Sequence, residues 1–127
     1  MSGPAIRIPA LLIAFCCAAG PAGAQEPKAP AAGAKTITLP AREFHEECMD
    51  LAARQPLEYA FHSAAPLEFN IHYHRDNKIH YPVLKKGVTR LSGTYVPERS
   101  DGYCMMWRNA ATKPVELDYR FKAAAKK

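Results

Sequence analysis

Strict alternation of apolar and polar residues near the carboxyl end of the chain is the feature that most constrains its fold. Residues 115–122, VELDYRFK, place an apolar side chain at every second position. A period of two belongs to a β-strand that buries one face and exposes the other. The segments LEYAFHS at 57–63 and FNIHYH at 69–74 repeat this period. The chain is therefore predicted to build its core from the apolar faces of strands.

Turn signals divide the chain into short strands. We expect a first strand at residues 36–39, a turn at SAAP, residues 63–66, and a second turn at Asp76–Asn77. Several short strands at this spacing predict an all-β fold, which is a single-domain antiparallel β-sandwich of jelly-roll-like type. It is expected to span residues 36–122, with a disordered tail at 123–127.

One segment fits two structures. Residues 41–55, AREFHEECMDLAARQ, have the propensity of a charged helix that ends near Arg54. The alternative is an irregular strand that carries Cys48 inward. The residues alone leave both open.

Residues 1–24 have the organisation of a secretory signal peptide. Arg7 precedes an apolar stretch at 11–19, and small residues lead up to a cleavage site expected after Ala24. The apolar stretch is too short to span a membrane, and the mature chain is predicted to have no transmembrane segment. A flexible lead-in rich in Ala, Pro, Gly and Lys is expected at 25–35. The protein is therefore predicted to be periplasmic or secreted.

Removal of the leader takes away Cys16 and Cys17 and leaves Cys48 and Cys104. Two distant cysteines in an exported chain most often form a disulfide, and two buried free thiols are the alternative. A bridge that closes a loop of about 55 residues would stabilise the fold by roughly 3–4 kcal/mol. That is a substantial gain for a mature domain of about 100 residues, which buries only a modest core.

Four segments together resemble a known family. They are HEECMDL at 45–51, LEYAFHS at 57–63, LEFNIHYH at 67–74 and SDGYCMMWRNAATKPVELDYRF at 100–121. The pattern is similar to the GOLD domain, the lumenal β-sandwich of cargo receptors in the early secretory pathway. In that family a Glu-Cys segment is disulfide-linked to a Gly-Tyr-x-x-Cys-like strand, which is soon followed by an Asn and a final strand.

The resemblance has three implications for this chain. Glu47–Cys48 and Gly102–Cys104 take the places of the two linked segments, and Asn109 follows as expected, so the resemblance implies a Cys48–Cys104 disulfide. It favours a strand over a helix at 41–55. It also implies a non-enzymatic interaction role. Receptors of that family continue into a coiled coil and a membrane span, whereas this sequence ends at Lys127, so we expect only the fold and a general interaction role to carry over from the resemblance.

Three histidines surround the turn at residues 76–77. If Tyr73 pairs with Tyr81 to keep one apolar face, then His74 pairs with His80, and His72 lies beside them on the polar face. Side chains at these positions would be about 5–7 Å apart at Cβ, close enough to share an ion. His72, His74 and His80 are thus a candidate zinc or copper site, and a hydrated polar face without metal is the alternative.

Neighbouring residues refine this hypothesis. Glu58 is expected across from His72 and would orient its imidazole. Met105 and Met106 also offer thioethers for copper, but adjacent strand residues point to opposite faces. We therefore expect one methionine in the core with Trp107 and the other outside.

Other function classes find little support. The net charge is +5 and the pI is about 9.1, but the lysines and arginines are dispersed, so nucleic acid is not an expected partner. Ser63, Ser92 and Ser100 are turn-like, and no catalytic residue is predicted. The sequence predicts an exported non-enzymatic binding or accessory module whose partner is another exported or membrane protein. The alternative is a periplasmic zinc- or copper-binding protein.

Overall fold

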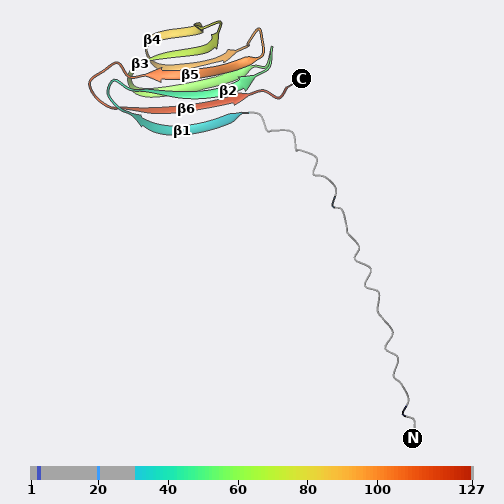
Figure 1. Cartoon of the computed structure of the whole chain (residues 1–127). Coiled ribbons are helices and arrows are strands. Elements are labelled where there is room, and N and C mark those ends of the chain that lie inside the picture. The colour runs from blue at the N-terminus through green and yellow to red at the C-terminus, as the bar shows by residue number, and fades with distance from the viewer. Residues whose placement is uncertain (1–2, 4–19, 21–30, 127) are drawn as a thin grey trace.

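The computed structural model describes residues 3, 20 and 31–126. Most of the predicted leader, its cleavage site and most of the lead-in lie outside the described residues. Six strands form in the order β1 (Ala32–Leu39), β2 (Phe44–Leu51), β3 (Leu57–Arg75), β4 (Lys78–Tyr95), β5 (Asp101–Arg108) and β6 (Val115–Ala123) (Figure 1). In the described part of the chain, no helix is long and apolar enough to cross a membrane.

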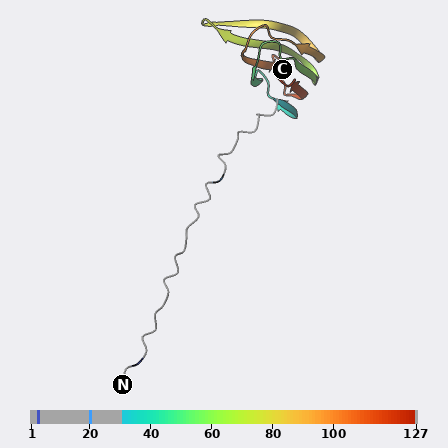
Figure 2. The same cartoon turned by 90° about the vertical axis from the view of Figure 1, so that its right-hand side faces the viewer.

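The long strand β3 connects two layers. All pairings are antiparallel, in the order β1-β6-β3-β5-β2, with β4 along the other edge of β3. Residues 57–63 of β3 pair with β6, whereas residues 68–72 pair with β5. The sheet therefore turns over on itself between these two parts of β3. One layer is β1-β6-β3-β4 and the other is β2-β5-β3-β4, and the tip of the β3–β4 hairpin extends beyond the other strands (Figure 2).

The core lies between the two layers. Phe61 and Phe69 of β3 have ring centroids 5.0 Å apart, Phe69 is 5.5 Å from Trp107 of β5, and Trp107 is 4.5 Å from Tyr119 of β6. Because β5 and β6 do not pair with each other, the last contact crosses from layer to layer. Aromatic pairs at such distances add to the stabilisation that burial provides. The predicted all-β antiparallel sandwich is confirmed, as is the buried face of residues 115–119.

Polar side chains close the edge where β1 and β2 face each other. Lys35 Nζ lies 2.7 Å from Glu47 Oε1, the Tyr119 hydroxyl donates to the same carboxylate, and His45 Nε2 lies 2.8 Å from the Tyr119 oxygen. Burial opposes ionisation of Glu47, but the hydrogen bonds from Lys35 and Tyr119 outweigh it and hold the pKa of this carboxyl below its usual value. This cluster ties the two layers together.

Two expected boundaries differ from the structure. Strand β1 begins at Ala32, so its first residues come from the segment that was expected to be a flexible lead-in. At the other end, the backbone N–H groups of Ala123 and Ala124 donate to Ala31 and Pro56, although both residues were expected in a disordered tail. The hydrogen bonds to these neighbouring segments hold residues that have little side-chain signal of their own.

The turn predicted at residues 63–66 is wrong. Strand β3 continues through this segment, with a register shift against β4 between His62 and Leu67. Pro66 has no N–H, but it lies where β3 has left β6 and has not yet reached β5. A proline is tolerated at such an irregularity. The turn-like residues therefore mark the place where the sheet turns over.

The segment at 41–55 forms strand β2 and not the helix that propensity favoured. This outcome agrees with the expectation from the GOLD resemblance. However, His45, Glu47 and Met49 point inward, and Cys48 is exposed. Helix propensity is overridden because β2 pairs with β5 along its full length and packs its inward side chains on the core.

Asn109 is the buried polar residue with the most hydrogen bonds. Its Nδ2 donates to the carbonyls of Leu39, Pro40 and Lys113, and its Oδ1 accepts from the Ala111 N–H. We expect Asn109→Leu to lower the free energy of unfolding by about 3 kcal/mol, because buried carbonyls lose their partners. Denaturant unfolding measures this.

Asn70→Leu is the matched control. Asn70 is also fully buried, but its Nδ2 has no hydrogen-bond partner among the described residues. Its replacement by Leu removes this unpaired donor but also the Oδ1 partner of His72 Nδ1, and because these two effects oppose each other, the free energy of unfolding is expected to change by less than about 1 kcal/mol. Equal losses in the two variants would contradict this account.

Candidate functional site

The candidate site lies on the outer face of the β2-β5-β3-β4 layer. Residues that pair directly across antiparallel strands point to the same face. Cys48, Cys104 and His72 therefore form one row across β2, β5 and β3. We call this surface the disulfide face; it comprises Phe44, Glu46, Cys48, Asn70, His72, His74, Ile79, Tyr81, Leu84, Cys104 and Met106.

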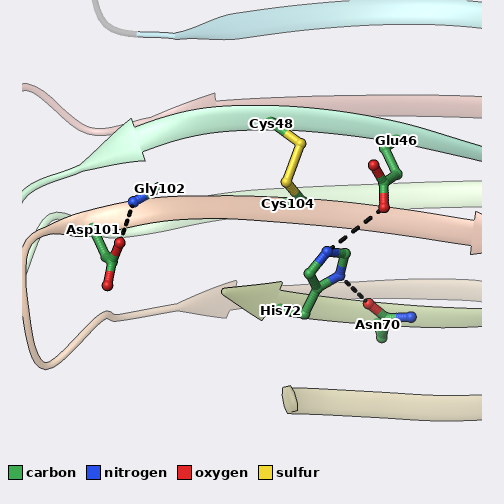
Figure 3. Close-up of a disulfide and its surroundings, with 7 residues drawn as sticks. All are labelled: Glu46, Cys48, Asn70, His72, Asp101, Gly102 and Cys104. Carbon is green, nitrogen blue, oxygen red and sulfur yellow. Dashed lines mark hydrogen bonds and ion pairs between the residues drawn. A yellow bond between two sulfur atoms is a disulfide. The ribbon is translucent and has the colours of Figure 1, made fainter. Parts of the chain in front are cut away.

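The disulfide joins the first two residues of this row, and His72 lies on the next strand (Figure 3). Cys48 and Cys104 are bonded, with their Cα atoms 4.0 Å apart, which confirms the predicted bridge. The bridge joins two residues that the β2–β5 ladder already places opposite each other. Cys48 is exposed, so the bridge is an outer crosslink and not a core element.

His72 is buried although it points outward. Its side chain is 6% exposed, with the Tyr81 ring 5.8 Å and the His74 ring 5.3 Å away. Nδ1 lies 2.8 Å from Asn70 Oδ1, and Nε2 lies 3.6 Å from Glu46 Oε1 (Figure 3). Burial lowers the pKa of His72, the Glu46 charge opposes this shift, and His74 adds to it. The imidazole is therefore mainly neutral at neutral pH.

Asn70 is the second buried polar residue on this face. It is fully buried, its Oδ1 faces His72, and its Nδ2 has no hydrogen-bond partner among the described residues. A buried donor without a partner destabilises a fold by about 1–3 kcal/mol. Folded proteins leave few buried polar groups unpaired, so this donor needs an explanation.

The three candidate histidines do not come together. Tyr73 pairs with His80 and His74 with Ile79, so the predicted pairs Tyr73–Tyr81 and His74–His80 are wrong. His80 stacks on Tyr73, with ring centroids 4.8 Å apart, on the face opposite to His74.

The turn at residues 76–77 and a bulge in β4 explain why the predicted histidine pairs do not form. Asp76 and Asn77 both have positive φ, which is typical of a two-residue hairpin turn, and such a turn sets the register. The register then shifts by one residue between Ile71 and Tyr73, where Tyr81 and Pro82 together face one residue of β3. Pro82 cannot donate to the ladder, so it occupies a bulge.

The expected partner of His72 is also different. Glu58 pairs with Thr94 and Lys122 in the part of β3 that belongs to the other layer. Glu46 approaches His72 instead. The sequence does contain a signal for this, since Glu46 is two residues before Cys48 and must share its face, but only the β2–β5 register brings it to His72.

The remaining candidates are placed as follows. Met105 is buried in the core with Trp107, and Met106 is partly exposed on the disulfide face, as expected. Among the described residues, the group of metal-binding side chains with ligand atoms within 4.8 Å of one another is Glu46, Cys48 and Cys104, and its two sulfurs are bonded to each other.

The other layer carries two shallow depressions of about 590 and 560 Å³ on its surface. Ala60 and Ser92 lie in both, beside the longer Arg120. These hollows form where small residues lie between long ones. His62 and Asp118, which pair across β3 and β6, line the first of them, and Asp118 accepts a hydrogen bond from the Thr36 hydroxyl.

The fold and this surface define a disulfide-linked antiparallel β-sandwich. No family model matches the chain, and no curated protein matches it. Among solved structures, the chain is similar to the crystal structure of the Yersinia pseudotuberculosis-derived mitogen, with a TM-score of 0.54 and 12% identity over 77% of this chain and 90% of the mitogen. A de novo designed double-stranded β-helix, solved by solution NMR, has a TM-score of 0.42 and 17% identity over 70% of this chain and 97% of the design. The mitogen comparison supports a β-rich, jelly-roll-like fold.

The burial of His72 predicts a pH dependence of stability. Because burial lowers its folded pKa below the reference value of 6.5, the unfolded chain binds a proton that the folded chain does not. The contribution of neutral His72 to the free energy of unfolding is fully present above its unfolded pKa. It is lost as the pH drops through 6.5 toward the folded pKa of this histidine. Denaturant midpoints of the oxidised protein in a metal chelator should fall between about pH 7.5 and about pH 5.5.

His72→Gln should remove most of this slope. His62→Gln, which changes an exposed histidine of β3, should keep it. Glu46 and His74 are the charged groups that shift the pKa of His72, and neither variant changes them. If the two variants and the wild type showed the same slope, the account of His72 would be wrong.

The outer position of the disulfide predicts a loss of stability without a change of fold. The double variant Cys48→Ala with Cys104→Ala should lose roughly 3–4 kcal/mol of unfolding free energy, because a loop between residues 56 apart is no longer closed in the unfolded chain. Denaturant unfolding gives the loss, and amide exchange of β2 and β5 reports whether the strands still pair. Complete loss of protection in β2 would contradict the prediction.

Proposed function

We propose that this chain is an exported, non-enzymatic binding module, similar to the GOLD domain, which holds another exported or membrane protein on its disulfide face. The proposed location is the periplasm or the extracellular space. Proteins of these compartments keep their disulfides, and the Cys48–Cys104 bridge is consistent with such a location.

One observation carries the proposal. Among the described residues, five large hydrophobic side chains are strongly exposed, and all but Val96 lie on the disulfide face: Phe44, Ile79, Tyr81 and Leu84. Single exposed apolar side chains are common on proteins, but a group on one face marks an interaction surface. The buried polar residues Asn70 and His72 lie on the same face.

The edge of the sheet adds a second way to bind a partner. Strand β4 pairs with β3 alone among the described strands, and most of its residues are exposed. A strand edge of this kind can accept an extended segment of another protein by backbone hydrogen bonding. The bulge at Pro82 interrupts this edge, which limits uncontrolled pairing.

The polar side chains support a non-enzymatic role. Ser63 Oγ donates to the carbonyl of Ala65, and Ser100 Oγ accepts from the N–H of Ala53. Both hydroxyls therefore hold backbone segments. Nucleophilic catalysis by serine needs a base within hydrogen-bond reach, and neither residue has one among these contacts.

The similarity to the GOLD domain has support in the same region. The Glu47–Cys48 strand lies beside the Gly102–Cys104 strand, and the disulfide joins them as the resemblance implied. Asn109, which follows in the expected place, is a buried structural residue.

Substitutions on the disulfide face should abolish partner binding. The chain is expressed with its own leader, with a photo-reactive residue at Phe44, and crosslinked partners from the envelope or medium are identified. We expect one exported or membrane protein to be captured, and its capture to fall at least about tenfold with Tyr81→Glu or Leu84→Glu, since residues at the centre of an interface supply most of its binding energy.

Val96→Glu is the matched control. Val96 is 51% exposed, compared with 49% for Tyr81 and 47% for Leu84, but it lies outside the disulfide face. The three variants should have the same thermal stability. Capture that is lost equally in all three, or in none, would show that the disulfide face is not the binding surface.

A further inference from the structure

Three side chains that can bind zinc, those of Glu46, Cys48 and Cys104, lie together on the disulfide face, and His72 lies beside Glu46 (Figure 3). We propose that Cys48, Cys104, His72 and Glu46 bind a zinc ion when the disulfide is reduced, so that the bridge and the metal site are alternative states of the same residues. This inference goes beyond the proposed partner binding and does not depend on it. It also uses a different residue set from the three-histidine hypothesis.

Three of the four ligands already lie close together. Ligand atoms of Glu46, Cys48 and Cys104 lie within 4.8 Å of one another, and His72, outside that group, has its Nε2 3.6 Å from Glu46 Oε1. Zinc bonds of about 2.0–2.3 Å in tetrahedral geometry put neighbouring ligand atoms about 3.3–3.8 Å apart. The two sulfurs separate when their bond breaks, and side-chain rotation then has to bring them and His72 Nε2 around one ion.

His72 is already oriented as a ligand. Asn70 Oδ1 can only accept a hydrogen bond, so the His72 nitrogen that faces it at 2.8 Å, Nδ1, carries the proton. The lone pair of Nε2 then faces Glu46, and these two acceptor atoms have no hydrogen between them. A cation between them removes this repulsion. Fixing a metal-binding imidazole through its other nitrogen is common in zinc proteins. Asn70 is thus a positioning residue, and its burial keeps the imidazole in place.

The backbone holds the two thiols in place after reduction. Strands β2 and β5 pair over eight positions, from Phe44 opposite Arg108 to Leu51 opposite Asp101. Cys48 and Cys104 therefore stay opposite each other without their covalent bond. His72 pairs with Cys104 on the next strand, so three ligands come from three adjacent strands. Such a framework is rigid enough to preorganise a metal site.

The reaction requires a reductant of the dithiol class. The dithiol supplies two electrons and two protons, the Cys48–Cys104 sulfur–sulfur bond breaks, and the reductant becomes a disulfide. Zinc then displaces the two thiol protons, which go to solvent, and two zinc–sulfur bonds form. Cys48 is exposed, so a reductant can reach it, and exposed disulfides are reduced more readily than buried ones.

The test compares the full exported chain in its oxidised and reduced states. Zinc binding is measured by titration calorimetry, and cobalt is used as a spectroscopic probe of sulfur ligation. The reduced protein should bind one zinc ion per chain, give a thiolate-to-cobalt charge-transfer band, and melt at a higher temperature with zinc. The oxidised protein should show none of these changes.

Variants assign the ligands. His72→Gln and Glu46→Gln should weaken zinc binding by the reduced protein, and Asn70→Leu should weaken it by about ten- to a hundredfold, the range for loss of a residue that orients a ligand. His74→Gln and His80→Gln are the controls. His74 is near the site, with its ring 5.3 Å from His72, but it is outside the proposed set and should have no effect.

Several results would overturn the proposal. These are equal zinc binding by the oxidised and reduced proteins, a cobalt spectrum without the thiolate band, or loss of binding in the His74 and His80 variants but not in His72→Gln. If reduction unfolds the chain, zinc must restore the β-sheet signal, because metal binding stabilises the state that holds its ligands. A reduced chain that stays unfolded with zinc also excludes the site.

Discussion

The structure depends on one shared strand. Hydrogen bonds of β3 join β6 in its first part and β5 in its second part, and β4 follows it along both. This arrangement makes one continuous sheet into two packed layers, so Phe69 and Trp107 meet Tyr119 in a single core. Lys35, Glu47 and Tyr119 then close the edge where β1 and β2 face each other. Aromatic packing, hydrogen bonding and charge pairing thus act on different parts of the same boundary between layers.

The disulfide is an outer crosslink and does not join the two layers. It connects two strands that are already paired, and it lies on the outside beside His72 and Asn70. Two buried polar residues on an outer face destabilise the fold unless something compensates for them. The proposed partner and the proposed zinc site each give these groups a role. The first uses the apolar side chains around them, and the second uses the sulfur atoms next to them.

The sequence-based predictions agree with the structure where a single physical rule was enough to make them. The alternation at residues 115–122 needed only the period of a strand, and the disulfide needed only two cysteines and a resemblance. They disagree where two rules competed. The histidine register was inferred from keeping apolar residues on one face, but the positive φ values at Asp76 and Asn77 set a two-residue turn, and the bulge at Pro82 absorbed the mismatch. His80 therefore does not lie on the same face as His72 and His74, and Glu46 of strand β2 lies beside His72 instead.

By itself, the sequence determined that strands would form and which side chains could be buried, because the period of apolar residues is a local property. With the predicted leader removed, it also left only Cys48 and Cys104 to pair. Only the tertiary structure decided that Cys48 faces outward, that Asn70 and His72 are buried on an outer face, and that Glu46 lies against them. These features depend on the register between strands far apart in the chain. That register is set by the sum of many backbone pairings and not by any one segment.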